Sequence, residues 1–130
     1  MTTPSLTGAR VLLVEDEGAI SLLLESLLES LGCRIAGLAS TLPEADRLAA
    51  SADIDIALLD VNVGGMPVYP AAERLVARGI PIVFSTGYGA EGLDRRWHST
   101  PILVKPFTVR QLESMLRRVL RDRIPAGSGA

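Results

Sequence analysis

Residues 10–17 have the sequence RVLLVEDE, in which a continuous apolar run after Arg10 ends abruptly in acidic residues. A short run that is apolar at successive positions is typical of a strand buried on both faces, as in a parallel sheet. The pattern recurs in DIALLD (residues 55–60) and IPIVF (80–84), and in shorter form in ILV (102–104). We therefore expect strands at these four places and a weaker one over residues 34–38.

Segments with helical spacing alternate with these runs. Leucines recur every three or four positions after the first run, and Gly32 is a plausible stop for that helix. Thr41-x-x-Glu44 and Thr108-x-x-Gln111 have the spacing of capping boxes, which open helices. The expected helices cover residues 20–31, 41–52, 69–78 and 108–120.

The alternation of strands and helices predicts an α/β fold: a doubly wound, five-stranded parallel sheet covered by helices on both faces. One connection is weak. Residues 87–100 have little apolar periodicity, and Gly89 and Gly92 interrupt what there is. The loop over residues 61–67 contains Gly64 and Gly65 but lacks the Lys-Ser/Thr of a nucleotide-binding loop.

The composition indicates one domain. The chain has 130 residues, 48% of them hydrophobic, and a net charge of −2, which provides no field to attract nucleic acid or an anionic membrane. The lone cysteine, Cys33, excludes an internal disulfide and favours a reducing, cytoplasmic location. No signal peptide or membrane helix is expected. We expect a flexible N-terminus (1–8), one domain (9–122) and a flexible tail (123–130).

Polar side chains follow the strands where each strand ends. Glu15 and Asp16 follow the first run, Asp60 ends the third strand, Thr86 follows the fourth, and Lys105 follows the fifth. Taken singly, such residues are more often helix caps or surface groups. Because the carboxyl ends of parallel strands share one edge, we expect these to converge. Clustered carboxylates repel one another and would raise one another's pKa, and Mg²⁺, which prefers oxygen ligands, relieves this.

Four motifs together resemble the receiver domains of two-component response regulators. They are VLLVEDE (11–17), LLDVN (58–62), FSTG (84–87) and VKPF (104–107), in the family's order and at suitable spacing. The resemblance covers residues 9–121 and implies a stand-alone, CheY-like (flavodoxin-like) receiver with strand order 2-1-3-4-5. It implies a phosphorelay switch and not an enzyme, served by a histidine kinase or histidine phosphotransferase. An unidentified downstream protein would receive the signal.

The resemblance also implies residue roles. Asp60 would be the phospho-acceptor, Thr86 the switch hydroxyl, and Lys105 a contact to a phosphoryl oxygen. Asp16 and Asp60 would bind Mg²⁺ directly, Asn62 through its backbone carbonyl and Glu15 through water. Pro106 resembles the cis-proline that usually follows the lysine.

One position departs from the family. Many receivers have Tyr or Phe three residues before the lysine, where this chain has Ile102. We therefore expect phosphorylation to act through backbone order in residues 87–100 and not through an aromatic flip. Trp97 is interpreted as a packing residue and His98 as a surface one.

Three other functions are compatible with parts of the sequence pattern. A Mg²⁺-dependent aspartyl-phosphate phosphohydrolase would want a second acid where Asn62 stands, and a cap domain. A pseudo-receiver that never takes phosphate would be expected to lack some of the key residues. A flavodoxin-like cofactor carrier would need a phosphate-binding loop after the first strand, where acidic residues stand instead.

Overall fold

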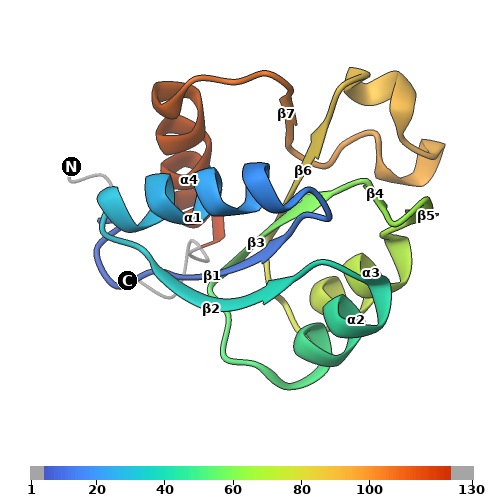
Figure 1. Ribbon diagram of the computed structural model, residues 1–130, viewed down its shortest axis with the longest axis horizontal. Coiled ribbons are helices and arrows are strands. Elements are labelled where there is room, and N and C mark those ends of the chain that lie inside the picture. Colours follow the sequence, from blue (N-terminus) through green and yellow to red (C-terminus); the bar gives the residue numbers. More distant parts are fainter. Residues whose placement is uncertain (1–4, 124–130) are drawn as a thin grey trace.

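The apolar runs form one parallel sheet in the computed structural model, which describes residues 5–123 (Figure 1). Its strand order is β2-β1-β3-β6-β7, and β4 and β5 form a separate pair. If the five strands of this sheet are numbered by their order in the sequence, their order across the sheet is the expected 2-1-3-4-5. The predicted α/β doubly wound sheet is therefore confirmed. The strands are β1 (Arg10–Val14), β2 (Arg34–Ala39), β3 (Ile56–Asp60), β6 (Ile82–Thr86) and β7 (Ile102–Val104).

Helices cover both faces of the sheet (Figure 1). The helices α1 (Gly18–Ser30) and α4 (Val109–Arg123) lie on one face, and α2 (Leu42–Ser51) and α3 (Tyr69–Ala77) on the other. Each face has its own core, and successive strand residues alternate between the two cores because side chains alternate along a strand. Leu58, Val83 and Leu103 thus pack on the α1–α4 side, and Leu59 and Phe84 on the α2–α3 side.

The helix starts agree with the capping signals, with one difference. At α4, the Gln111 N–H donates to Thr108 Oγ1 at 3.1 Å and the Thr108 N–H donates to Gln111 Oε1 at 2.8 Å, a reciprocal capping box. At α2, the Glu44 N–H donates to Thr41 Oγ1 at 3.3 Å, but the Glu44 carboxylate accepts from Ser40 and from the Thr41 hydroxyl and not from the Thr41 N–H.

The segment expected to be a plain loop between β3 and α3 is a small hairpin. Strands β4 (Asn62–Val63) and β5 (Met66–Pro67) pair antiparallel. Gly64 and Gly65 connect them with φ angles of 59° and 79°. A two-residue hairpin turn with positive φ at both positions favours glycine, so the Gly-Gly pair determines this turn.

Strand β6 continues two residues beyond Phe84, where the sequence predicts its end. Ser85 pairs with Leu103 and Thr86 with Val104, and both polar residues are buried. Residues 87–100 then form only two 3₁₀ turns, η1 (Gly89–Gly92) and η2 (Arg95–Trp97), as expected from the weak periodicity.

An aromatic cluster holds this irregular segment on the domain. Trp97 is buried, and it stacks on Tyr69 with ring centroids 5.7 Å apart and meets the Phe84 ring edge-on at 5.5 Å. The Tyr69 hydroxyl accepts a hydrogen bond from the Asp94 N–H at 2.9 Å. The interpretation of Trp97 as a packing residue is confirmed, and His98 is exposed as expected.

Part of the N-terminal segment that was expected to be flexible packs against the domain. Leu6, which falls in the segment 1–8 expected to be flexible, is 1% exposed and packs in the α1–α4 core. The Gly8 N–H also donates to the Gly32 carbonyl at 2.8 Å. Residues 1–4 of that segment and residues 124–130 of the expected tail lie outside the described residues. Within residues 5–123, no helix combines the length and apolar character needed to span a membrane.

Candidate functional site

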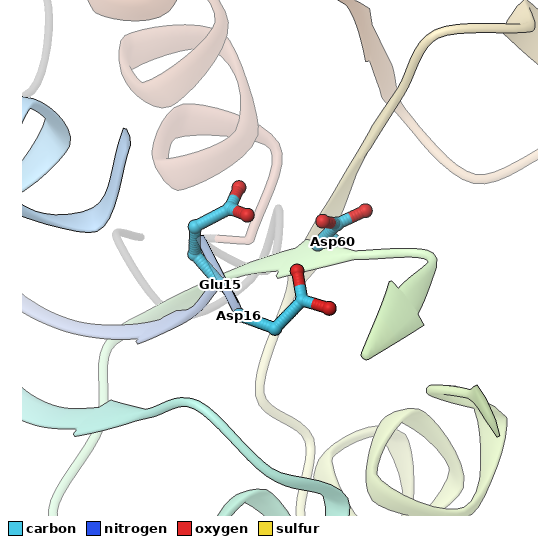
Figure 2. Close-up of side chains that lie close together, drawn as sticks. All are labelled: Glu15, Asp16 and Asp60. Carbon is cyan, nitrogen blue, oxygen red and sulfur yellow. The ribbon is translucent and has the colours of Figure 1, made fainter. Parts of the chain in front are cut away.

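The carboxyl ends of four neighbouring strands bring the expected polar groups to one edge of the sheet. Figure 2 shows the side chains of Glu15, Asp16 and Asp60 gathered beside the ends of β1 and β3. One carboxylate oxygen from each lies within 4.8 Å of the other two. Glu15 is 2% exposed, Asp60 is half-buried and Asp16 is exposed. The three acids therefore form a cluster of carboxylate oxygens in which Asp16 is the member exposed to solvent.

Lys105 completes the cluster from the far strand. Its ammonium donates to Glu15 Oε1 at 3.0 Å and to Asp60 Oδ2 at 3.3 Å. Three carboxylates and one ammonium leave two negative charges without a compensating cation within the group. Oxygen donors and a charge of this size suit a hard divalent cation such as Mg²⁺, so the residues present fit the expected metal.

The pKa of Asp60 shows the electrostatic cost of the arrangement. Burial raises it from an ordinary value of 3.8 to about 6; the charge and hydrogen bond of Lys105 oppose the rise, and Glu15 adds to it. Mutual repulsion of the acids, the cause expected from the sequence, is thus the smaller contribution. Burial lowers the pKa of Lys105, but its interactions with Glu15 and Asp60 outweigh this and leave its pKa above the ordinary value.

The β4–β5 hairpin orients Asp16, which sequence reasoning did not anticipate. The Gly64 N–H donates to Asp16 Oδ2 at 2.8 Å, across 48 positions of the chain. This bond fixes one carboxylate oxygen beside the cluster. The sequence signal that could have revealed it is the Gly64-Gly65 pair, which is typical of a two-residue hairpin turn.

Asn62 lies directly after the acceptor strand. Its side chain is exposed, and its backbone N–H donates to Asp60 Oδ1 at 3.4 Å. Together with Lys105 on Oδ2, this contact holds both carboxylate oxygens of Asp60. The role expected for Asn62, metal binding through its carbonyl, stays a prediction.

Thr86 is buried at the end of β6, and its Oγ1 accepts a hydrogen bond from the Tyr88 N–H at 3.1 Å. The η1 turn lies close to this hydroxyl: a Cβ on Gly92 would come within 3.2 Å of it. Ile102 is half-buried and packs on the α2–α3 core. The Lys105–Pro106 peptide is cis, as expected.

The raised pKa of Asp60 predicts how stability depends on pH in the metal-free protein. Folded Asp60 keeps its proton up to about pH 6, whereas in the unfolded chain it loses it near 3.8. The folded state binds more protons between these values, so this group lowers the free energy of unfolding as pH rises through that window. Asp60→Asn, which cannot ionise, should therefore be more stable than wild type by about 1–3 kcal/mol above pH 6 and should match it near pH 4.

Urea denaturation in the presence of a chelator, at pH 7.5 and pH 4, measures this difference. Asp53→Asn is the control, because the Asp53 side chain is 87% exposed and only a 3.8 Å contact joins it to Arg10. Equal stabilities of wild type and Asp60→Asn at pH 7.5 would show that the buried carboxylate carries no such cost.

Comparison with known proteins agrees with this geometry. Residues 11–117 match the family described as response regulator receiver domain. SdrG from Sphingomonas melonis Fr1 is similar in structure, with a TM-score of 0.77 and 38% identity over 93% of this chain and 99% of that one. The receiver domain of PhyR from Erythrobacter litoralis has a TM-score of 0.80 and 29% identity over 91% of this chain and 94% of that one.

A third solved structure bears on the metal. The receiver domain of the sensor histidine kinase PA1611 from Pseudomonas aeruginosa PAO1 is described with a magnesium ion in its active site cleft. It has a TM-score of 0.77 and 29% identity over 88% of this chain and 99% of that one. The chain spans only 16% to 52% of the length of the curated relatives that it matches.

Proposed function

The chain belongs to the response regulator receiver domain family of two-component signalling, and from this premise we propose that it is a switch phosphorylated on Asp60 with the help of Mg²⁺. The observation that carries the proposal is the contact of Lys105 with Asp60 inside the acidic cluster, 3.3 Å from Nζ to Oδ2. An acceptor carboxylate, a cation that neutralises incoming phosphate and a set of oxygen ligands stand together at the strand ends.

The chemistry assigned to Asp60 is nucleophilic attack on phosphorus. One carboxylate oxygen forms the new O–P bond while the P–N bond of a phosphohistidine breaks, and the imidazole leaves with the bonding pair and takes up a proton. With a pKa of about 6, Asp60 is mostly ionised at neutral pH and can attack. Lys105 stabilises the negative charge on the phosphoryl oxygens.

The acidic cluster and the residue Asn62 are proposed to hold the metal. Asp16 and Asp60 bind it directly, Asn62 offers its backbone carbonyl, and Glu15 acts through a water molecule. Bound Mg²⁺ supplies charge neutralisation for the transferring phosphoryl group. The hydrogen bond from the Gly64 N–H supports this assignment, because it holds the exposed Asp16 carboxylate in place beside the cluster.

Thr86 is proposed as the residue that changes its contacts when Asp60 is phosphorylated. Its hydroxyl already binds the Tyr88 N–H at the start of residues 87–100, so a turn of the hydroxyl toward a phosphoryl group removes that contact. The packing of Gly92 against the same hydroxyl supports the proposal that residues 87–100 respond.

Receiver domains are signalling modules, and we assign this chain no enzymatic turnover of its own. The proposed phosphoryl donor is a histidine kinase or histidine phosphotransferase, and the signal passes to a further protein, with no part for nucleic acid or membrane. The proposed location is cytoplasmic, which suits a lone, buried cysteine. The pseudo-receiver alternative is not favoured, because acceptor, acids, hydroxyl and lysine are all present.

The metal assignment predicts that Asp16→Ala lowers Mg²⁺ affinity by about 10- to 100-fold, because it removes a direct carboxylate ligand. Titration calorimetry measures the affinity, and intact mass after incubation with acetyl phosphate measures phosphoryl uptake at limiting Mg²⁺. Asp94→Asn is the matched control, since it is an exposed acid outside the cluster. Unchanged Mg²⁺ affinity in Asp16→Ala would exclude Asp16 as a ligand. Mg²⁺-independent phosphoryl uptake by the wild type would contradict the proposed mechanism.

A further inference from the structure

Ser85 is a buried hydroxyl for which the structure provides no hydrogen-bond partner. Its side chain is 2% exposed, and its Oγ is the one buried side-chain polar atom among the described residues that lacks a partner. Native proteins pair nearly all such groups, because an unpaired one loses its hydration without compensation. The exception therefore needs an explanation, and it lies within the sheet edge that carries the acidic cluster.

The register of the sheet places Ser85 beside the acceptor. On one side its Cα is paired with that of Asp60, and on the other with that of Leu103. Paired residues of parallel strands project to the same face, and Leu103 and Val83 both pack in the α1–α4 core. The Ser85 hydroxyl thus faces the same side of the sheet as the Asp60 carboxylate.

Lys105 must pass over Ser85 to make its contacts. In the sheet, β6 lies between β3 and β7, and Lys105 directly follows β7. Its ammonium nevertheless reaches Asp60 at the end of β3 and Glu15 beyond β1. The side chain therefore passes the end of β6, the strand that carries Ser85. An ammonium has three N–H donors, and these two carboxylates occupy two of them.

We propose that Ser85 is a positioning residue for Lys105, and that its hydroxyl replaces Glu15 as a hydrogen-bond acceptor of the ammonium when Mg²⁺ is bound and Asp60 is phosphorylated. This inference rests on the proposed function. With its charge neutralised by the metal, Glu15 no longer holds the ammonium on the β1 side of Asp60. Moving back toward β7, the ammonium meets Ser85 Oγ, which then holds it against the phosphoryl oxygens. The orphaned hydroxyl is thus an acceptor that is used only in the active state.

The sequence provides a direct probe, because Lys105 is the only lysine of the chain. Protein labelled with ¹⁵N and ¹³C in lysine alone gives one set of side-chain NMR signals. These are compared between wild type and Ser85→Ala, first metal-free and then with Mg²⁺ and beryllofluoride, a mimic of the phosphoryl group. We expect matching Lys105 signals in the metal-free proteins and different ammonium signals in the activated ones.

Phosphoryl uptake from acetyl phosphate is the second readout. Ser85→Ala should slow it by about tenfold, the size expected when a hydrogen bond to a charged group is lost, with Mg²⁺ affinity unchanged. Ser85→Thr keeps the hydroxyl and should restore most of the rate. Val83→Ala is the control, since it trims a buried side chain on the same strand and face without removing a hydroxyl.

The outcomes separate this inference from the function on which it rests. If wild type takes up the phosphoryl group and Ser85→Ala does so equally fast, with the same Lys105 signals in the activated state, the role of Ser85 is refuted and the proposed function stands. Equal slowing in Ser85→Ala and Val83→Ala would also refute it, because packing alone would then explain the effect. If the wild type itself takes up no phosphoryl group, both proposals fail.

Discussion

Asp60→Asn is expected to abolish phosphoryl uptake from acetyl phosphate, a loss on the order of 10³-fold or more, while the protein stays folded. The amide keeps the size of the carboxylate but has no ionised oxygen to attack phosphorus. Lys105 and the Asn62 N–H hold Asp60. Lys105 and the Glu17 N–H hold Glu15 in a similar way, but Glu15 is 2% exposed, so Asp60 is the more accessible of the two acids. Intact mass spectrometry over a time course measures the loss.

The control for this experiment is Asp53→Asn. It makes the same chemical change at an exposed acid three residues before β3, outside the acidic cluster. It should take up phosphate at the wild-type rate. Uptake by Asp60→Asn at a comparable rate would mean that another residue is the acceptor. Because the variant is expected to be at least as stable as wild type, unfolding cannot account for its loss of function.

Trp97→Ala is expected to lower the free energy of unfolding by about 3–5 kcal/mol, the usual cost of removing a buried large aromatic side chain. The indole is 6% exposed; it stacks on Tyr69, meets Phe84 edge-on, and has the Arg96 guanidinium 5.0 Å from its ring centroid. Two short 3₁₀ turns contribute few hydrogen bonds of their own, so packing of Trp97, together with that of the buried Leu93, attaches residues 87–100 to the domain. Urea denaturation followed by circular dichroism measures the change without relying on tryptophan fluorescence.

Tyr88→Ala is the matched control, since Tyr88 is an aromatic residue of the same segment but is 79% exposed. It should change the free energy of unfolding by less than about 0.5 kcal/mol. If Trp97→Ala has an equally small effect, the aromatic cluster does not hold residues 87–100 on the domain.

The sheet and its ordering could be predicted because they depend on local signals. Each apolar run is short, ends in a polar residue and alternates with a helical segment, and the two capping boxes mark helix starts. The convergence of Asp60 and Lys105 follows from parallel strands alone. These features are determined by neighbours in sequence and by the topology rules for parallel sheets.

What the sequence did not reveal depends on contacts between distant residues. The bond from Gly64 to Asp16 requires both the hairpin and its position beside the segment that follows β1. The burial that dominates the pKa of Asp60 comes from the packing around the strand ends. The apolar run predicts that the fourth strand ends at Phe84, yet pairing with Leu103 keeps Ser85 in the sheet. The response of residues 87–100 to phosphorylation stays a prediction.

Asp60 is proposed to carry the phosphoryl group, and chemical trapping of the product identifies the residue that does so. Borohydride reduces an acyl phosphate to the alcohol, which converts a phosphorylated aspartate to homoserine, and fragment masses of the peptides then locate it. After incubation of wild type with acetyl phosphate and Mg²⁺, we expect homoserine at position 60, and none when a chelator is present. Reduction at Glu15 or Asp16, or an acid-stable phosphate on a hydroxyl such as that of Thr86, would contradict it.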